Sequence, residues 1–268
     1  MKALVASFVV LFALGAQARD LVLVTGFDPF GGARVNHSWV VAQSIRDIFQ
    51  NDPNIEIALC QLPTTYAGAY PKLAECYNNL PQAPLFVLSL GEGPKELNLE
   101  TQVYNMDHNP RGNGNAADNA GARRNRSPII AGAPFNVGLR VDVAALYCAL
   151  SPAERATTVV SATPGNFVCN NASYQFTSLH PEVPFTFAHV VGQKAKNIQA
   201  KLRAMPRTLS TIIRRQVELS KLPAGPTPHV TNSIRMPIKR DDLAPIRAQS
   251  SGCELEFYNK LHGDMLSK

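Results

Sequence analysis

Apolar residues along this chain form short continuous runs that alternate with longer segments in which apolar positions follow helical spacing. The first continuous run covers residues 20–25 (DLVLVT) and ends at a glycine, which is typical of a strand buried on both faces. Helical spacing follows over residues 38–49, and a strand-like run covers residues 55–62. The alternation continues with a predicted helix over residues 66–80 and an apolar strand over residues 84–90.

The second half of the chain continues this order less regularly. It predicts strands over residues 157–162 and 185–191, and helices over residues 141–150 and 209–219. Strands that alternate with helices form parallel βαβ units, because each helix carries the chain back to the start of the next strand. We therefore predict an α/β fold, a three-layer α/β/α sandwich whose central twisted sheet is mixed but mostly parallel. Active sites in such sheets lie beyond the carboxyl ends of the strands.

The amino-terminal residues have the pattern of a targeting segment. Lys2 precedes an uncharged apolar run over residues 3–14, and residues 16–18 (AQA) supply the small residues that a signal peptidase requires. The run is too short to form a stable membrane-spanning helix. We therefore expect residues 1–18 to be a cleaved secretory signal peptide, so that the mature protein is secreted or periplasmic and has no membrane contact after cleavage.

The carboxyl-terminal residues also differ from the alternating pattern, which is confined to residues 19–220. A proline-rich stretch over residues 222–229 is followed by a segment of weak periodicity that continues to the end of the chain. We expect residues 221–268 to be a C-terminal extension that packs loosely, or not at all, on the main domain.

Composition and charge exclude several classes of protein. Of the 268 residues, 45% are hydrophobic and 17% are charged, which is the balance of a globular domain. The formal net charge is +6, but the basic residues are scattered along the chain, so nucleic-acid binding is not indicated. The sequence contains neither a Cys-x-x-Cys pair nor a His-Glu-x-x-His run, so we expect no zinc site and no thioredoxin-like motif.

The chain has five cysteines, and an odd number in an oxidising compartment leaves at least one thiol free. Cys60 with Cys76, or Cys148 with Cys253, could form stabilising disulfides. Neither pairing follows from the sequence alone, because four cysteines allow three connectivities.

Cys169 follows a predicted strand and a Pro-Gly turn, and the segment after it has helical character. A thiol in the first turn of a helix feels the positive end of the helix dipole, which lowers its pKa and favours the thiolate. Cys169 is therefore the candidate nucleophile. The alternative interpretation is a buried structural cysteine.

A thiolate needs a base and an acidic group that orients it. His189 lies near the end of the predicted strand over residues 185–191, so it would emerge at the carboxyl edge of the sheet. Glu92, Glu96 and Glu100 all follow an earlier strand on that side, and their positions do not rank them.

Several motifs resemble the family of pyroglutamyl peptidase I, also called pyrrolidone-carboxylate peptidase. The most specific matches are residues 26–32 (GFDPFGG) with residues 36–39 (NHSW), and residues 165–170 (GNFVCN) around the candidate nucleophile. Weaker matches keep the same order along the chain and occur at residues 62–64 (LPT), 100–105 (ETQVYN), 118–121 (DNAG) and 188–190 (AHV). The resemblance covers about residues 21–220. It implies that residues 19–220 are a pyroglutamyl-peptidase-like catalytic domain.

The resemblance implies a Cys-His-Glu triad made of Cys169, His189 and Glu100, and it thereby selects Glu100 among the three carboxylates. It also implies a pocket that holds the flat pyroglutamyl ring against aromatic side chains, with the backbone around two further residues hydrogen-bonding the lactam. The substrate-binding residues that follow from it are Phe27, Phe30, Phe167, Val168, Thr64 and Glu92.

The implied reaction is the removal of pyroglutamate from blocked peptide N-termini through a thioester, with no metal or organic cofactor. A neutral lactam suits an apolar pocket, whereas an ordinary N-terminal ammonium ion would be penalised there.

Two alternatives remain open: a secreted cysteine hydrolase for another small amide, since Glu92 and Thr101 depart from the family pattern, and a non-catalytic binder of blocked peptide N-termini. A homo-oligomer is also left open.

Overall fold

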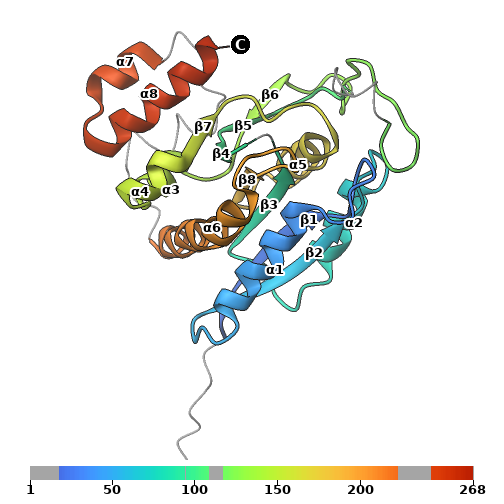
Figure 1. The fold of residues 1–268 in the computed structure, drawn as a ribbon, viewed down its shortest axis with the longest axis horizontal. Coiled ribbons are helices and arrows are strands. Elements are labelled where there is room, and N and C mark those ends of the chain that lie inside the picture. The colour runs from blue at the N-terminus through green and yellow to red at the C-terminus, as the bar shows by residue number, and fades with distance from the viewer. Residues whose placement is uncertain (1–17, 94, 109–116, 223–242, 268) are drawn as a thin grey trace, which may run out of the picture.

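The computed structural model describes residues 18–93, 95–108, 117–222 and 243–267 (Figure 1). Most of the predicted signal peptide therefore lies outside the described residues. The first half contains β1 (Asp20–Phe27), α1 (His37–Phe49), β2 (Ile55–Leu62), α2 (Ala69–Asn78), β3 (Phe86–Glu92), β4 (Leu97–Glu100) and β5 (Gln102–Tyr104). The second half contains β6 (Asn136–Gly138), α3 (Val143–Cys148), α4 (Pro152–Thr157), β7 (Thr158–Ser161), α5 (Val168–Leu179), β8 (Phe185–Val190), α6 (Ile198–Lys221), α7 (Leu243–Gln249) and α8 (Gly252–Leu266).

The main sheet has six strands in the order β2-β1-β3-β8-β4-β7. Neighbouring strands from β2 to β8 are parallel, whereas β4 runs antiparallel to β8 and parallel to β7. The two strands β4 and β7 therefore run opposite to the other four. A small second sheet pairs β5 with β6 in antiparallel orientation. The prediction of a mixed, mostly parallel sheet is confirmed.

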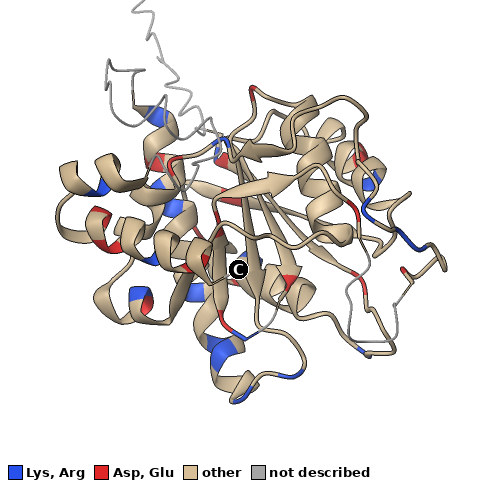
Figure 2. Cartoon of the chain, turned by 90° about the horizontal axis from the view of Figure 1, so that it is seen from above, with Lys and Arg blue, Asp and Glu red and all other residues tan. Residues whose placement is uncertain are grey.

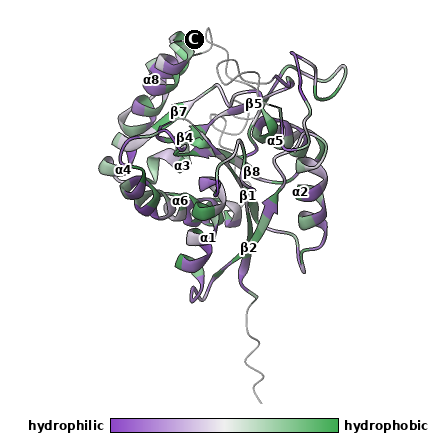
Figure 3. Cartoon of the chain, turned by 45° about the vertical axis from the view of Figure 1, so that its right-hand side comes forward, coloured by the Kyte–Doolittle hydropathy of each residue, from purple (hydrophilic) through white to green (hydrophobic). Residues whose placement is uncertain are grey.

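Helices cover both faces of the sheet. Helices α1 and α6 pack together on one face, and α2 and α5 pack together on the other. Figure 3 shows the hydrophobic strands enclosed between helices that turn hydrophilic residues outward. The central strands are buried, as in the run Val22, Leu23 and Val24 of β1, because they pack against a helix layer on either side. This is the predicted three-layer α/β/α sandwich.

Charged residues of both signs are interspersed over the described helices and loops (Figure 2). The distribution agrees with the scattered basic residues of the sequence. Among the described helices, none combines the length and the apolarity that crossing a bilayer requires.

The start of α1 is built directly onto the end of β1. The Asn36 side chain caps the helix by accepting a hydrogen bond of 3.0 Å from the Ser38 N–H, and the Phe27 N–H donates to Ser38 Oγ at 2.9 Å. Gly26 permits this contact, since a Cβ atom there would lie 2.8 Å from the Ser38 carbonyl group. Strand and helix therefore meet closely, with Phe27 held at the carboxyl edge of the sheet.

Two disulfides are present, Cys60–Cys76 and Cys148–Cys253, which are the two pairs considered from the sequence. The second disulfide joins α3 to α8 and so ties the C-terminal extension to the domain. Within the described part of this extension, Leu243, Phe257 and Leu261 are buried. The sequence predicted that residues 221–268 pack loosely, or not at all, on the main domain. In the structure, residues 243–267 pack on the edge of the fold, and α8 contacts both β7 and α3.

Candidate active site

Cys169 is the second residue of α5, with Phe167 in the N-cap position. It is the one cysteine of the five that is outside a disulfide, and its side chain is partly exposed. The turn before the helix uses Gly165 at a φ of +77°, a conformation that favours glycine. The thiol thus lies in the first helical turn, where the helix dipole favours a negative charge.

His189 and Glu100 meet across the junction between β8 and β4. The antiparallel register places Asn98 opposite His189, so Glu100, two residues further along β4, projects on the same side of the sheet. His189 Nδ1 lies 2.9 Å from Glu100 Oε1. The Glu100 side chain is fully buried, whereas that of His189 retains 12% exposure. The carboxylate therefore orients one ring nitrogen while the ring remains accessible from outside.

The electrostatics of His189 couple it to Cys169 as well. Burial alone would lower the pKa of His189, but its hydrogen bonds to Cys169 and Glu100 and the negative charges of those groups outweigh burial and raise the pKa to about 10. The imidazole is therefore held protonated between a sulfur and a carboxylate at neutral pH. The structure brings the three residues of the predicted triad together: His189 is hydrogen-bonded to Glu100 and shares a cavity wall with Cys169.

Two glycines make this close approach possible. A Cβ atom at Gly91 would lie 3.0 Å from Cys169 Sγ and 2.9 Å from His189 Cδ2. A Cβ atom at Gly93 would lie 2.5 Å from the Cβ of His189. Such distances are too short for a Cβ atom without a shift of its neighbours, so residues 91 and 93 must be glycines for the sulfur and the imidazole to pack over them.

Gly91→Ala is therefore expected to lower the rate at which iodoacetamide alkylates Cys169. The new methyl group displaces Cys169 and His189 from each other, and misplacement by about 1 Å costs up to roughly 100-fold in reactivity that depends on alignment. Gly263→Ala is the matched control, because a Cβ atom at Gly263 meets nothing within 4 Å. Equal alkylation rates in both variants and the wild type would contradict this account of Gly91.

A cavity of about 380 Å³ opens beside these residues, and Cys169 and His189 form part of its wall. Of the substrate-binding residues predicted from the sequence, Phe27, Phe30, Phe167, Thr64 and Glu92 line the cavity. Val168 is fully buried and is not among the lining residues.

Aromatic side chains form one wall of the cavity. The ring centroids of Phe30 and Phe167 are 5.0 Å apart, and Tyr66 contacts Phe167 edge-on at 5.4 Å. Tyr66 is not among the lining residues but packs against one of them, and the sequence did not single it out because it is one aromatic residue in a helical pattern. Polar side chains that also line the cavity and were missed are Asn36, Asn98, Asn166 and Asn170.

Asn170 fixes the start of α5 against β5. Its side chain donates to the Tyr104 carbonyl oxygen at 2.8 Å and accepts from the Tyr104 N–H at 2.8 Å. Because Asn170 follows Cys169 directly, this paired hydrogen bond limits the movement of the thiol. The position next to Cys169 within the GNFVCN motif was the only signal available for Asn170 in the sequence.

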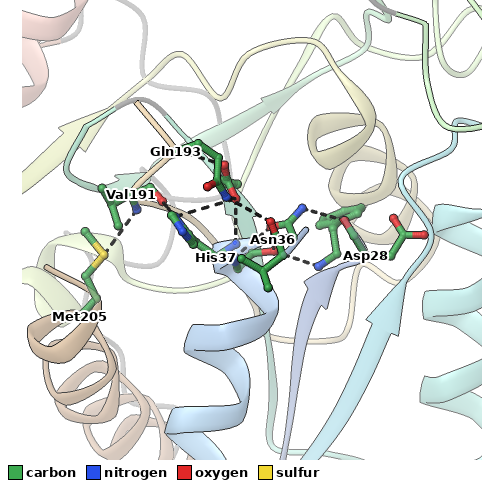
Figure 4. A network of polar contacts seen from close by, with 10 residues as sticks. Asp28, Asn36, His37, Val191, Gln193 and Met205 are labelled. Carbon is green, nitrogen blue, oxygen red and sulfur yellow. Dashed lines mark hydrogen bonds and ion pairs between the residues drawn. The ribbon is translucent and has the colours of Figure 1, made fainter. Parts of the chain in front are cut away.

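The Glu92 carboxylate is held in a polar network at the rim of the cavity (Figure 4). It accepts from the His37 N–H at 2.7 Å and from both the backbone and side-chain N–H groups of Gln193, at 3.2 and 3.1 Å. His37 Nδ1 lies 2.9 Å from the Val191 carbonyl oxygen. The network ties the start of α1 to the segment after β8, so the Glu92 charge is already engaged by protein donors.

No group of three or more histidine, cysteine or acidic residues that could hold a metal ion occurs within the described ranges.

Comparisons with known proteins agree with this geometry. The family model of pyroglutamyl peptidase matches residues 20–209. A pyrrolidone-carboxylate peptidase of Yersinia pestis is 29% identical over 175 residues, which cover 63% of this chain and 77% of the relative.

Solved structures show the same fold. Pyroglutamyl peptidase I from Bacillus amyloliquefaciens superimposes with a TM-score of 0.64 at 22% identity, covering 78% of this chain and 100% of that chain. Pyrrolidone carboxyl peptidase from Fervidobacterium islandicum superimposes with a TM-score of 0.60 at 24% identity, covering 74% of this chain and 98% of that chain.

Proposed function

Because the chain belongs to the pyroglutamyl peptidase family of cysteine peptidases, we propose that it removes N-terminal pyroglutamate from peptides in a secreted or periplasmic setting. One observation carries the proposal: the single free thiol, Cys169, and His189 lie together in the wall of an aromatic cavity, and His189 is hydrogen-bonded to the buried Glu100. A binder of blocked peptide ends has no use for all three groups, so this geometry favours an enzyme.

The cavity suits a neutral, flat ring. Phe27, Phe30 and Phe167 provide apolar contact, and the polar lining residues can accept or donate hydrogen bonds to a lactam. A free N-terminal ammonium would lose its hydration on entering this wall of aromatic rings. At the rim, three N–H donors hold the Glu92 carboxylate in a fixed orientation.

The reaction begins with the Cys169 thiolate beside a protonated His189. The sulfur attacks the pyroglutamyl carbonyl carbon, and the resulting oxyanion is stabilised by N–H groups in the first turn of α5, which have no partner within the helix. The tetrahedral intermediate collapses as His189 gives its proton to the leaving amine, and a thioester remains on Cys169. Neutral His189 then takes a proton from water, whose oxygen attacks the thioester and releases free pyroglutamate and the thiolate. Glu100 keeps the imidazole oriented throughout.

Secretion is supported by the amino-terminal pattern and by the two disulfides, which form and persist in oxidising compartments. The catalytic thiol escapes pairing because the other four cysteines are already joined. The mature protein should begin at Arg19; an intact Met1 in protein recovered from the secreted fraction would contradict this part of the proposal.

The deciding assay compares a pyroglutamyl amide reporter with a prolyl amide reporter of the same ring size. Proline carries a secondary ammonium and a methylene where pyroglutamate carries a neutral lactam N–H and carbonyl, so the pair tests recognition of the neutral lactam as a whole. We expect kcat/KM for the pyroglutamyl reporter to be at least about 100-fold higher, because a site built around a polar pattern rejects a mismatched one by that much or more. No release from the pyroglutamyl reporter would refute the proposal, and equal release from both would refute the charge-based selectivity.

A hydrolase for another small amide is the second candidate, and it was suggested by the departures at Glu92 and Thr101. Thr101 donates to the Ser161 carbonyl oxygen from its hydroxyl at 3.1 Å and from its backbone N–H at 2.8 Å, and it is not among the residues that line the cavity. Glu92 is engaged in the network at the rim. Neither departure adds a free recognition group, so pyroglutamyl substrates remain the better supported class.

A further inference from the structure

We propose that the C-terminal helix α8 is part of the active-site support, and that Asp264 on this helix positions the segment that leads to Cys169. The matched family region ends at residue 209, so this helix, at residues 252–266, lies beyond it. The inference depends on Cys169 being the reactive thiol, and it holds whichever amide the enzyme cleaves.

Helix α8 is firmly attached to the domain. The Cys148–Cys253 disulfide holds its first turn, and Phe257 and Leu261 bury their side chains against the fold. Glu256 accepts from the Tyr147 hydroxyl at 2.6 Å and pairs with Arg155 at 3.0 Å. A covalent link, apolar burial and a polar cluster thus give the helix a defined place beside β7 (Figure 1).

Side chains of α8 satisfy backbone groups along the edge strand β7. At the start of the strand, Lys260 Nζ donates to the carbonyl oxygen of Thr158 at 3.0 Å, and it also donates to that of Arg155 in the preceding helix α4 at 2.6 Å. At the end of the strand, Asp264 Oδ2 accepts from the Ala162 N–H at 2.9 Å and lies 3.2 Å from Thr163 Oγ1. β7 is the last strand of the main sheet, so no neighbouring strand is available to these backbone groups. Side chains of α8 form hydrogen bonds with them instead.

Ala162 is the point at which this support meets the active site. It is 1% exposed, so its N–H needs a protein partner, and Asp264 supplies one. Its carbonyl oxygen accepts from Gln102 Nε2 at 2.7 Å and from the Tyr104 hydroxyl. Both backbone polar groups of Ala162 are therefore fixed, one by α8 and the other by β5.

From this anchor the chain runs directly along the wall of the cavity to the nucleophile. Residues 163–167 all line the cavity, and Cys169 follows two residues later. The same segment is held once more where the His108 N–H donates to the Asn166 carbonyl oxygen at 2.7 Å. A shift at Ala162 would therefore move the cavity wall and the start of α5 together. Asp264 is thus a positioning residue that acts through residues 162–167.

The test uses the full-length mature protein with both disulfides intact and compares Asp264→Ala with Asp264→Asn and Glu254→Ala. Two quantities are measured: the pH profile of Cys169 alkylation by iodoacetamide, and kcat and KM for the pyroglutamyl reporter. Alkylation does not depend on substrate identity. If the reporter is not cleaved at all, the alkylation profile still tests this inference while the proposed function alone fails.

Asp264→Ala is expected to lower kcat/KM by about 10- to 100-fold, with a loss in kcat as well as a rise in KM, and to shift the alkylation profile. Asp264→Asn keeps an acceptor oxygen and should restore most of the activity. Glu254→Ala removes an exposed carboxylate from the first turn of the same helix and should leave both quantities unchanged. Unchanged kcat/KM and alkylation in folded Asp264→Ala would overturn the inference, as would equal losses in Asp264→Ala and Glu254→Ala.

Thr163→Val keeps the inference testable if Asp264→Ala does not fold. This substitution preserves the side-chain shape and removes the hydroxyl that lies 3.2 Å from Asp264 Oδ2. The same hydroxyl also lies 3.4 Å from Ser161 Oγ, and the loss of these contacts predicts a reduction of at least about threefold in kcat/KM and an altered alkylation profile. Wild-type values for both would overturn the positioning role.

Discussion

Cys169→Ala is expected to abolish turnover of a pyroglutamyl reporter while the protein keeps its fold. The thiolate forms the bond to the substrate, and removal of a covalent nucleophile lowers kcat by on the order of 10,000-fold or more in enzymes of this kind. Alanine is the best helix former, and Cys169 is partly exposed, so α5 tolerates the change. The measurement is kcat under mild reductant, together with the melting temperature.

Cys169→Ser serves as the matched control for size. A hydroxyl is a far weaker nucleophile than a thiolate, so this variant should also be nearly inactive, and it should bind substrate with little change in affinity. Iodoacetamide should label the native wild-type enzyme at Cys169 and should label neither variant, because the other four cysteines are in disulfides. Substantial turnover by Cys169→Ala would mean that another group is the nucleophile.

Hydrophobic patterning predicted five of the six strands of the main sheet, including both edge strands β2 and β7, but it missed the inner strand β4 and the short strands β5 and β6 of the second sheet. Strands β1, β3 and β8 are continuous apolar runs because helices cover them on both faces. Strands β5 (QVY) and β6 (NVG) are only three residues long, so they carry no recognisable period. The reversed direction of β4 and β7 could not be predicted from the sequence either, since strand direction depends on loops and long-range packing rather than on composition.

The attachment of the C-terminal helix α8 was not predicted, for a different reason. Helix α8 carries apolar contacts at Phe257 and Leu261, but much of its attachment comes from Glu256, Lys260 and Asp264 and from a disulfide. A polar residue that bonds to the edge of a sheet looks the same in a sequence as one that faces solvent. The weak apolar period therefore indicated a loosely attached tail.

The residues of the candidate site were likewise predicted only in part from the sequence pattern. Cys169 and His189 could be inferred from their places at a helix start and a strand end, whereas only the family resemblance selected Glu100. In the structure, the three candidate carboxylates have different partners. Glu92 accepts N–H hydrogen bonds at the rim of the cavity, and Glu96 pairs with Lys201. Glu100 reaches His189 because β4 pairs with β8 in antiparallel register, and the sequence contains no direct record of that pairing.

Glu100→Gln is expected to lower kcat/KM by roughly 100- to 10,000-fold. Glutamine has nearly the same shape, but it lacks the charge that stabilises protonated His189, and its amide can present N–H instead of oxygen to His189 Nδ1. A comparable change in a serine-protease triad costs on the order of 10,000-fold through the wrong tautomer. The matched control is Glu96→Gln, which removes the same charge from a partly exposed carboxylate that pairs with Lys201, and it should leave kcat/KM within about twofold of the wild type.

The pH dependence distinguishes loss of charge from loss of packing. The pKa of His189 is raised to about 10 in the folded protein, in part by Glu100, from an ordinary value near 6.5. A raised pKa contributes stability that is fully present below about 6.5 and is lost as the pH rises through about 10. Glu100→Gln lowers the pKa of His189, so the alkaline limb of kcat/KM should move to lower pH, and the melting temperature should fall less steeply between pH 6 and pH 10 than in the wild type. An unchanged alkaline limb in Glu100→Gln would show that the carboxylate does not hold the proton on His189.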